Sequence, residues 1–481
     1  MNIKPFHSLF IAISTLWLGG CMVGPDYQRP SVNTPARYKE LPGWIQAAPS
    51  ADAPKGDWWT VFNDPLLNQL EPLVAVSNQT VRVDYANYQQ ALADVQIARS
   101  GLFPIVGISG SATQASTATG MTAVPQSTNS AGSLGGNVSW APDLWGAVRR
   151  TIEESKATAQ ASAAILANAT LSEQIALATA VIELRVTDAN IDLLQKTVDA
   201  YREFLLVVTN QGNAGTTAPS NVIAARTQLE SAQSGLIALG VARSQYANAI
   251  AVLVGKNPEA LNIPHSTWLP TLPTVPVGIP TTLLQRRPDI AVAERQMAAQ
   301  NAAIGIAIAA FYPSLSLSAS DGFSQSPLDG LLHLANHVWS LGTGVGETVF
   351  NGGARHGEVA AARAAYEATV ANYRATILNA FQNVENDLSG LRILAQQADV
   401  LDAAVHDANE GATIALNEYQ AGTVDYTTTA TAQAAALNAQ QSALNVQMQR
   451  LIDTVSLIGD LGGGWSNNEL KQSSLQAPNT R

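Results

Sequence analysis

Residues 314–320 read SLSLSAS, a strict alternation of apolar and hydroxyl side chains. In an extended chain Leu315, Leu317 and Ala319 point to one side, and the four serines point to the other. Such a segment is predicted to be a strand with one apolar and one wet face. Similar patterns predict four strands, at about 104–114, 132–142, 313–323 and 337–350. Each lasts about ten residues, the length that a tilted strand needs to cross the hydrocarbon of a bilayer.

The chain repeats itself in sequence. The motif NAGT at 213–216 returns as QAGT at 420–423, and LFP at 102–104 returns as FYP at 311–313, with offsets of 207 and 209 residues. An internal two-fold repeat of this kind predicts two halves with the same order of elements. The predicted divisions are repeat 1 at 58–256, a proline-rich linker at 257–280 and repeat 2 at 281–464.

A very long helix is predicted after the second strand of each repeat, at about 147–212 and 354–419, where no proline occurs. At 1.5 Å per residue such a helix is roughly 100 Å long, which no compact domain holds. Apolar residues recur every three or four positions along both segments, as expected for helices that pair along a narrow seam. A shorter helix follows each glycine turn, so each repeat is expected to end in a helical hairpin with its tip at about 213–220 or 420–427.

The strands raise the question of how they would be closed in a membrane. No unbroken run of 18 apolar residues follows residue 21, so a crossing is expected to use a closed barrel, because open strand edges are not satisfied in lipid. Four strands are too few, since the smallest single-chain barrels have about eight. Two chains would supply eight strands and three chains twelve, with the serine-rich faces around a water-filled lumen. The alternative is a soluble lipoprotein with two hairpin sheets and a helical bundle.

The N-terminal residues are typical of an exported bacterial lipoprotein. Residues 1–20 combine a lysine with a short apolar stretch, which predicts a signal peptide. The peptide ends in LGG before Cys21, the only cysteine of the chain, and this lipobox predicts an acylated, palmitate-bearing Cys21. Met22 follows, which favours sorting to the outer membrane rather than retention at the inner one. The remaining predicted segments are a proline-rich N-terminal arm at 21–57 and a polar C-terminal tail at 465–481.

The composition excludes several classes of function. The chain has 26 Lys and Arg against 37 Asp and Glu, a formal net charge of −11 and a pI of about 5.0, so it offers no basic face to a nucleic acid. No GxSxG or HExxH motif occurs, so neither enzyme activity nor a cofactor is expected. His333 and His337 stand four residues apart, but no third ligand is near them in sequence, and no metal site is predicted.

Six motifs spread over nearly the whole chain are specific in combination: CMVGPDYQRP (21–30), LLQRRPDI (283–290), AFYPSL (310–315), VFNGG (349–353), YQAGT (419–423) and LGGGW (461–465). They resemble the outer-membrane efflux ducts of the TolC-like family, most closely the lipoprotein members that serve resistance-nodulation-division pumps. The resemblance implies a mainly helical TolC-like fold in a homotrimer, with a 12-stranded β-barrel continued by a 12-helix α-barrel. It also implies outer-membrane lipid, a periplasmic adaptor protein and an inner-membrane pump as partners.

The resemblance further implies that the hairpin tips close the duct and meet the adaptor. The adaptor-contact turns would be Gly215, Thr216, Gly422 and Thr423. The gate candidates are Tyr419, Ser220, Asn221, Thr427, Thr431 and Asp425. Threonines occupy positions where family members place Leu or Asp, and Val424 stands where a basic residue can occur. A neutral tip is therefore predicted, with a conductance that depends weakly on pH between 4 and 7.

One conspicuous motif has a structural interpretation instead. In RRPDI (286–290), Pro288 suits the first turn of a helix and Asp289 suits its positive end, so the segment is predicted to be a hinge.

The function that these features predict is that of the outer-membrane channel in a tripartite efflux system, a passive exit duct for small toxic compounds or drugs. Two alternatives remain: the exit duct of a type I protein-secretion system, and a lipid-anchored periplasmic scaffold without a pore. The sequence does not identify the exported compounds, the pump, the adaptor or the resting state of the tip. Nor does it predict ion selectivity, because a net negative charge does not say where the carboxylates point.

Overall fold

The computed structural model describes residues 22–35, 37–40, 57–117, 127–273, 275 and 286–465. The predicted signal peptide, the lipidation site Cys21 and the tail after Trp465 lie outside these residues, as do parts of the N-terminal arm and the linker. The chain divides into two compact units. The first consists of the described parts of Met1–Ser31, Tyr88–Ala161 and Ala293–Tyr373, and the second of the described parts of Val32–Asn87, Ser162–Val292 and Arg374–Arg481.

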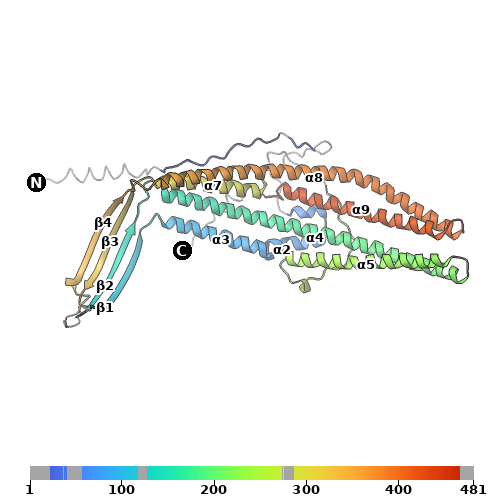
Figure 1. The fold of residues 1–481 in the computed structure, drawn as a ribbon, viewed down its shortest axis with the longest axis horizontal. Coiled ribbons are helices and arrows are strands. Elements are labelled where there is room, and N and C mark those ends of the chain that lie inside the picture. The colour runs from blue at the N-terminus through green and yellow to red at the C-terminus, as the bar shows by residue number, and fades with distance from the viewer. Residues whose placement is uncertain are drawn as a thin grey trace. The chain divides into compact units, whose positions relative to one another are not determined.

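The order helix, strand, strand, long helix, shorter helix occurs twice along the chain (Figure 1). Repeat 1 contains η1 (Trp58–Phe62), α2 (Pro65–Ser77), α3 (Gln79–Ser100), β1 (Ile105–Thr117), β2 (Ser127–Trp140), α4 (Ala147–Asn213), α5 (Pro219–Leu253) and η2 (Pro258–Ala260). Repeat 2 contains α7 (Pro288–Ala309), β3 (Ser314–Gln325), η4 (Leu334–Asn336), β4 (His337–Gly346), α8 (Ala354–Gln420) and α9 (Tyr426–Asp460).

The lengths of the helices reflect the sequence repeat. Helices α4 and α8 have 67 residues each, and α5 and α9 have 35 residues each. The strands differ more from their predicted bounds. Strand β2 already begins at Ser127 instead of near 132, and β4 ends at Gly346 instead of near 350. Gly346 pairs with Ser314 at the start of β3, and Pro313, which precedes Ser314, has no amide to extend the ladder.

The four strands form one antiparallel sheet in the order β1-β2-β3-β4, which belongs to the first unit. The central pairing of β2 with β3 joins the hairpin of repeat 1 to the hairpin of repeat 2. Each outer strand has one edge with no strand partner among the described residues. One open edge therefore belongs to β1 of repeat 1, and the other belongs to β4 of repeat 2.

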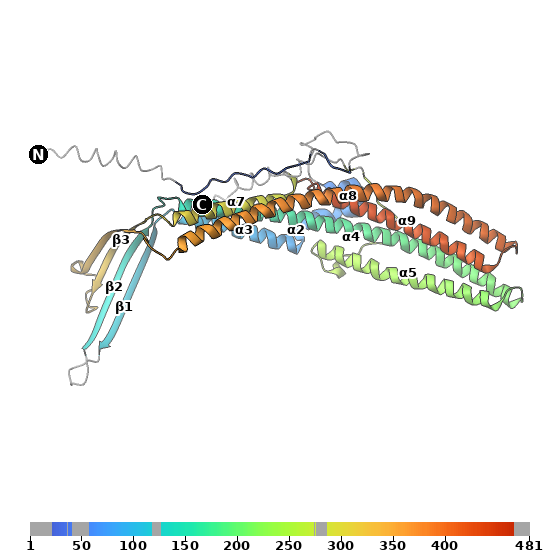
Figure 2. The ribbon, with the colours of Figure 1, turned by 45° about the horizontal axis from the view of Figure 1, so that its top comes forward.

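The second unit is built from paired helices around a common core. Figure 2 shows α5 running beside α4, and α9 beside α8. Its largest apolar cluster draws buried side chains from the short N-terminal helices, from α4 and from α9; among them are Phe62, Leu70, Leu177, Leu184, Leu451 and Val455. Burial of such side chains stabilises each by about 1.5–3 kcal/mol relative to exposure. The core thus ties the two repeats together within this unit.

Two of these helices, α4 and α5, are also long and apolar enough by composition to cross a membrane. The lack of an unbroken apolar run therefore does not by itself exclude helical spans. The two faces of the sheet are what favour the strands as the membrane-crossing elements.

Candidate exit path

The register of the strands sorts their side chains onto two faces of the sheet. Residues paired directly across neighbouring strands point to the same side. One row across the sheet is Val106, Val138, Ala319 and Leu341, and the adjacent row is Gly107, Asn137, Ser320 and Ser340. The first row is apolar, whereas the second is uncharged and small or polar. We call the side of the second row the serine face and the opposite side the apolar face.

The serine face is lined by small side chains. Ser320 Oγ lies 2.9 Å from Ser340 Oγ across β3 and β4. Ser318 is paired with Gly342, and a Cβ added to that glycine would lie 2.8 Å from the serine Oγ. Hydroxyl groups both donate and accept hydrogen bonds, so this face suits contact with water rather than with hydrocarbon.

The apolar face exposes large side chains in the single chain. The exposed fraction is 85% for Ile108, 76% for Leu341 and 68% for Trp339. A contiguous apolar surface of this kind indicates a membrane or another protein as its natural neighbour. Together with the strand length and the alternation of the two faces, it matches the lipid-facing side of a membrane barrel.

Both hairpin tips are built in the same way around a glycine. Gly215 has a φ of +72° and Gly422 a φ of +77°, in the left-handed region. The amide of the next residue, Thr216 or Thr423, donates to the carbonyl oxygen five residues earlier, at 2.9 and 3.0 Å. This is a common way for a helix to stop. A Cβ added to either glycine would meet nothing within 4 Å, so the backbone conformation selects glycine here.

Tyr419, a predicted gate residue, lies in an aromatic cluster inside the chain. Its ring packs edge-on against Phe204 with centroids 5.3 Å apart, and Tyr426 stacks on Phe204 at 5.5 Å. The Tyr419 hydroxyl donates to Gln211 Oε1 at 2.5 Å, and burial raises the pKa of the tyrosine. The polar partner of Tyr419 within the chain is therefore Gln211 of α4. No local sequence signal points to Gln211, because the contact joins two repeats.

Four other gate candidates lie nearer the surface of the tip. Ser220, Thr427 and Thr431 are exposed, and Asn221 is half-buried. The Asn221 side chain donates to Thr217 Oγ1 at 2.9 Å, within its own turn. These residues are thus placed where a neighbouring chain or a partner can reach them.

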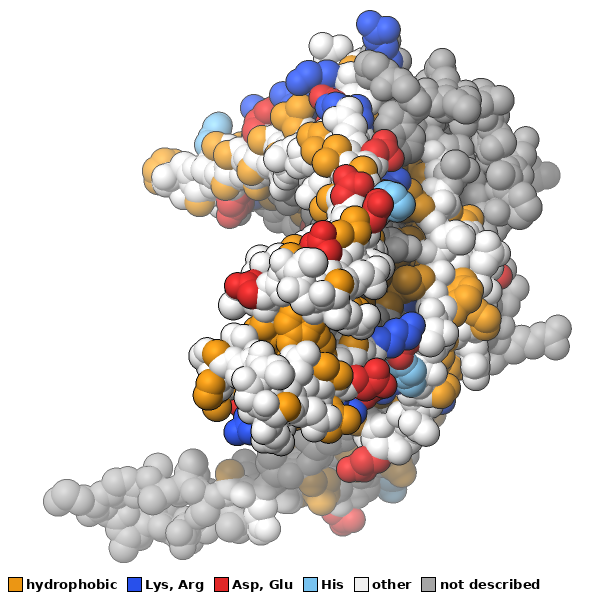
Figure 3. Space-filling model, turned by 90° about the vertical axis from the view of Figure 1, so that its right-hand side faces the viewer, with side chains coloured by type: hydrophobic (Ala, Val, Ile, Leu, Met, Phe, Trp, Pro, Cys, Tyr) orange, Lys and Arg blue, Asp and Glu red, His pale blue; other side chains and the backbone are white. Residues whose placement is uncertain are grey.

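Asp425, the remaining candidate, caps helix α9. Its carboxylate accepts hydrogen bonds from the Thr428 hydroxyl at 2.7 Å and from the Thr428 amide at 3.0 Å. These bonds hold the pKa of Asp425 below its usual value. The Asp425 carboxylate thus acts first as a helix cap. In the view onto the tips (Figure 3), uncharged surface predominates, and acidic and basic side chains are scattered over it.

The RRPDI segment, predicted to be a hinge, forms a clamp between two helices. Arg287 Nη1 donates to the carbonyl oxygen of Asp460 at 2.9 Å and to its carboxylate at 2.7 Å. Arg287 Nη2 donates to Asp289 Oδ2 at 2.7 Å. Pro288 opens α7, as predicted. The buried guanidinium thus links the start of α7 to the last turn of α9.

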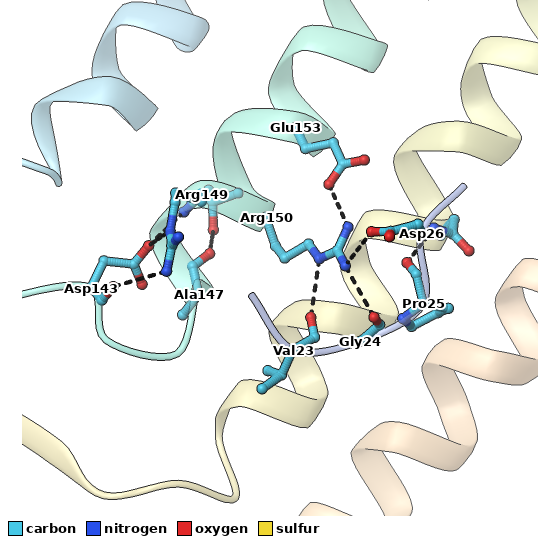
Figure 4. A network of polar contacts seen from close by, with 11 residues as sticks. Val23, Gly24, Pro25, Asp26, Asp143, Ala147, Arg149, Arg150 and Glu153 are labelled. Atoms are coloured by element: carbon cyan, nitrogen blue, oxygen red, sulfur yellow. Dashed lines mark hydrogen bonds and ion pairs between the residues drawn. The ribbon is translucent and has the colours of Figure 1, made fainter. Parts of the chain in front are cut away.

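In the first unit, Arg150 holds the N-terminal arm (Figure 4). Its side chain is 1% exposed and donates to the carbonyl oxygens of Val23 and Gly24, at 3.1 and 3.0 Å, and to Asp26 Oδ1 at 3.0 Å. The amide of Val23 donates to the carbonyl oxygen of Trp145 at 3.1 Å. Nothing in the local sequence pattern singles out Arg150, because all three partners in the arm lie far away in sequence.

The histidines before and in β4 do not form a recognisable metal site. Over the part of the chain that the structure describes, no group of three or more His, Cys, Asp or Glu side chains is arranged to hold a metal ion. His337 Nε2 instead lies 2.8 Å from Asp321 Oδ1.

A sheet with one wet and one exposed apolar face, in a chain that also carries long paired helices, is typical of outer-membrane channels that close a barrel from several chains. Comparison with known proteins identifies the family. The profile described as "Outer membrane efflux protein" matches residues 72–256 and 279–463, and the chain belongs to this family.

Relatives and solved structures agree with this assignment. The antibiotic efflux pump outer membrane protein ArpC and the toluene efflux pump outer membrane protein TtgC, both of Pseudomonas putida, are each 30% identical over 482 residues, or 98% of this chain and 99% of the relative. The outer-membrane channel OprN has a TM-score of 0.82 at 27% identity, over 92% of this chain and 100% of that chain. The chain thus has the trimeric TolC-like fold, and it is an outer-membrane efflux channel.

Proposed function

We propose that three copies of this chain form the passive exit duct of a tripartite efflux system. The observation that carries the proposal is the four-stranded sheet, with its apolar face, its serine face and the open edges of β1 and β4. An unpaired backbone group costs several kcal/mol in hydrocarbon. Pairing β1 of one copy with β4 of the next removes these edges and closes twelve strands around the serine faces.

The partners that we propose are a periplasmic adaptor protein and an inner-membrane pump of the resistance-nodulation-division class. Support comes from the two hairpin tips, which present the same glycine turn at Gly215-Thr216 and at Gly422-Thr423. Two equivalent turns in each of three chains would offer six similar docking positions. We infer that the adaptor contacts these turns.

The cargo that we propose is a class of small toxic compounds or drugs. The relatives named above are an antibiotic and a toluene efflux component, so similar ducts serve unlike compounds. A passive duct selects by width and polarity, and the pump would choose what enters it.

We also propose that the duct is anchored by acyl chains on Cys21. Support comes from the Arg150 network, which holds the backbone of Val23 and Gly24 within three residues of that cysteine (Figure 4). Several acyl chains give stable attachment where a single chain does not.

The gate that we propose at the tip is uncharged apart from Asp425. The exposed threonines Thr427 and Thr431 and the half-buried Asn221 would form the neutral constriction, with Ser220 beside it. Tyr419 would act indirectly, because its buried ring and its bond to Gln211 hold α8 against α4 near the tip.

Reconstitution of the purified protein into planar bilayers tests the proposed duct. We expect unitary currents, and their absence from correctly folded trimers would support the alternative of a lipid-anchored scaffold without a pore.

Deletion of the gene in the native host distinguishes an efflux duct from the exit duct of a type I secretion system. Sensitivity to drugs or solvents would support efflux, whereas loss of a secreted protein with unchanged drug tolerance would support type I secretion.

A further inference from the structure

A groove in the second unit lies where helices of the two repeats meet. It has a volume of about 460 Å³, and α4, α8, α9 and the linker before α7 each contribute to its lining. Four leucines form its apolar wall: Leu193 of α4, Leu272 of the linker, Leu401 of α8 and Leu444 of α9. Grooves of this size with a mostly apolar lining are typical of small-molecule sites, where a few polar groups fix the orientation of the ligand.

One such polar group in this groove is the guanidinium of Arg450, in α9. The side chain is half-buried, and its Nε is shielded from solvent and has no hydrogen-bond partner among the described residues. No ion pair in the described part of the chain includes Arg450. Asp453, one turn further along α9, accepts a hydrogen bond from Gln449 Nε2 at 2.7 Å instead. Because a buried donor of a charged group is costly without a partner, Arg450 suits an acceptor that a ligand supplies.

The other polar side chains in the lining narrow the chemistry of that acceptor. Gln440 and Gln447 of α9 add amide groups, and Asp402 of α8 is an exposed carboxylate. A guanidinium pairs best with the two oxygens of a carboxylate, through parallel hydrogen bonds. A cationic ligand would be repelled by Arg450, and an uncharged apolar compound would leave Nε without a partner.

We propose that this groove binds a small amphiphilic carboxylate, with its carboxylate on Arg450 and its apolar body against the four leucines. Leu193 belongs to repeat 1, whereas α8 and α9 belong to repeat 2, so one ligand would join the two repeats. At 1.5 Å per residue of α4, Leu193 is roughly 30 Å from the turn at Gly215. The site is thus separate from the tip. The inference goes beyond the proposed duct and does not depend on it, because the whole lining belongs to one chain.

Fluorescence binding to the protein in lipid nanodiscs tests this inference. The probe is 1-pyrenebutyrate, a carboxylate on an apolar body, and its neutral counterpart is 1-pyrenebutanol. Both are titrated at neutral pH into phosphatidylcholine discs with and without the protein, so that uptake by the lipid is subtracted. Arg450→Gln removes the charge, and the matched control is Arg226→Gln, at an exposed position of α5. Ala443→Phe narrows the groove but keeps Arg450.

We expect the wild-type protein to bind pyrenebutyrate saturably, and about tenfold or more tightly than pyrenebutanol. Arg450→Gln and Ala443→Phe should each weaken the binding of pyrenebutyrate by about tenfold or more, and Arg226→Gln should change it by less than about threefold. The inference would be overturned by a lack of saturable binding to the wild-type protein or by equal affinity for the two probes, results that require no variant to fold. Unchanged binding in Arg450→Gln would overturn it as well. Absence of unitary currents would instead overturn the proposed duct and leave the binding result unaffected.

Discussion

Replacing Arg150 by methionine should release the N-terminal arm while leaving the sheet intact. The side chain bonds two carbonyl oxygens and Asp26 in the arm, and also Glu153 at 2.7 Å on its own helix (Figure 4). The Asp26 and Glu153 side chains are 84% and 37% exposed, so these two ion pairs contribute about 0–1 kcal/mol each. In the variant the carbonyl groups of Val23 and Gly24 lose their hydrogen-bond donor, which costs about 1 kcal/mol each. Only the Asp26 pair joins Arg150 to the arm, so the attachment of the arm should be weakened by about 2–3 kcal/mol in all.

Limited proteolysis with chymotrypsin measures this opening. Cleavage after Tyr27, a half-buried residue whose hydroxyl donates to Glu294 Oε1 at 2.7 Å, requires the arm to leave the surface. When opening is fast and reversible, the cleavage rate follows the population of the open form. It should rise by about 30- to 150-fold in Arg150→Met. The control Glu153→Gln keeps the guanidinium and should change the rate by less than about threefold. An unchanged rate in Arg150→Met, or an equal rise in both variants, would show that the Arg150 guanidinium does not hold the arm.

Further predictions concern buried and titrating groups. Burial raises the pKa of Glu71 to about 9, and neither carboxyl oxygen has a hydrogen-bond partner. The free energy of unfolding should therefore fall as the pH rises from about 5 to 9. In thermal unfolding, Glu71→Leu should remove this slope and raise the free energy of unfolding by about 3 kcal/mol at pH 7. The hydrogen bond to the Asp192 carboxylate of α4 raises the pKa of His265. The segment around His265 should therefore be best protected from hydrogen exchange below pH 6.5 and should lose protection as the pH rises through the raised pKa. His265→Gln should abolish this pH dependence. Because the pKa of Asp425 is lowered, its cap on α9 is complete at neutral pH and is lost only as the pH falls through that lowered pKa. Single-channel conductance should vary little between pH 4 and 7. A strong block of the current that acid lifts would contradict the neutral tip. Gly422→Val should destabilise the tip by about 1–2 kcal/mol because of the left-handed backbone, whereas Gly422→Asn should be better tolerated, as hydrogen exchange of the turn would report.

Periodicity predicts much of the fold from the sequence alone. The alternation in SLSLSAS survives as the two faces of β3, because one apolar side of a strand must be kept from water. The long helices extend one residue beyond their predicted ends, since glycine stops are local signals that are visible in the sequence. The ends of the strands are less predictable, because the partner strand determines where a ladder ends.

Contacts between distant segments account for what the sequence does not predict. The bond of Tyr419 to Gln211 and the clamp of Arg287 on Asp460 join residues 208 and 173 positions apart. Arg150 reaches the arm across more than 120 positions. Each of these side chains is an ordinary polar residue in its own helix or turn, so no spacing or periodicity identifies its partner. The RRPDI segment contains Arg287 and Asp289, but nothing in it reveals the contact with Asp460.

In the proposed channel, the sheet of each chain is one third of a closed barrel, because the open edges of β1 and β4 require sister chains in lipid. Native mass spectrometry of the detergent-solubilised protein counts these chains. Three copies of the chain in one particle, and hence twelve strands, is the result that we predict. A stable monomer, or a dimer as the main species from protein extracted out of the outer membrane, would contradict it.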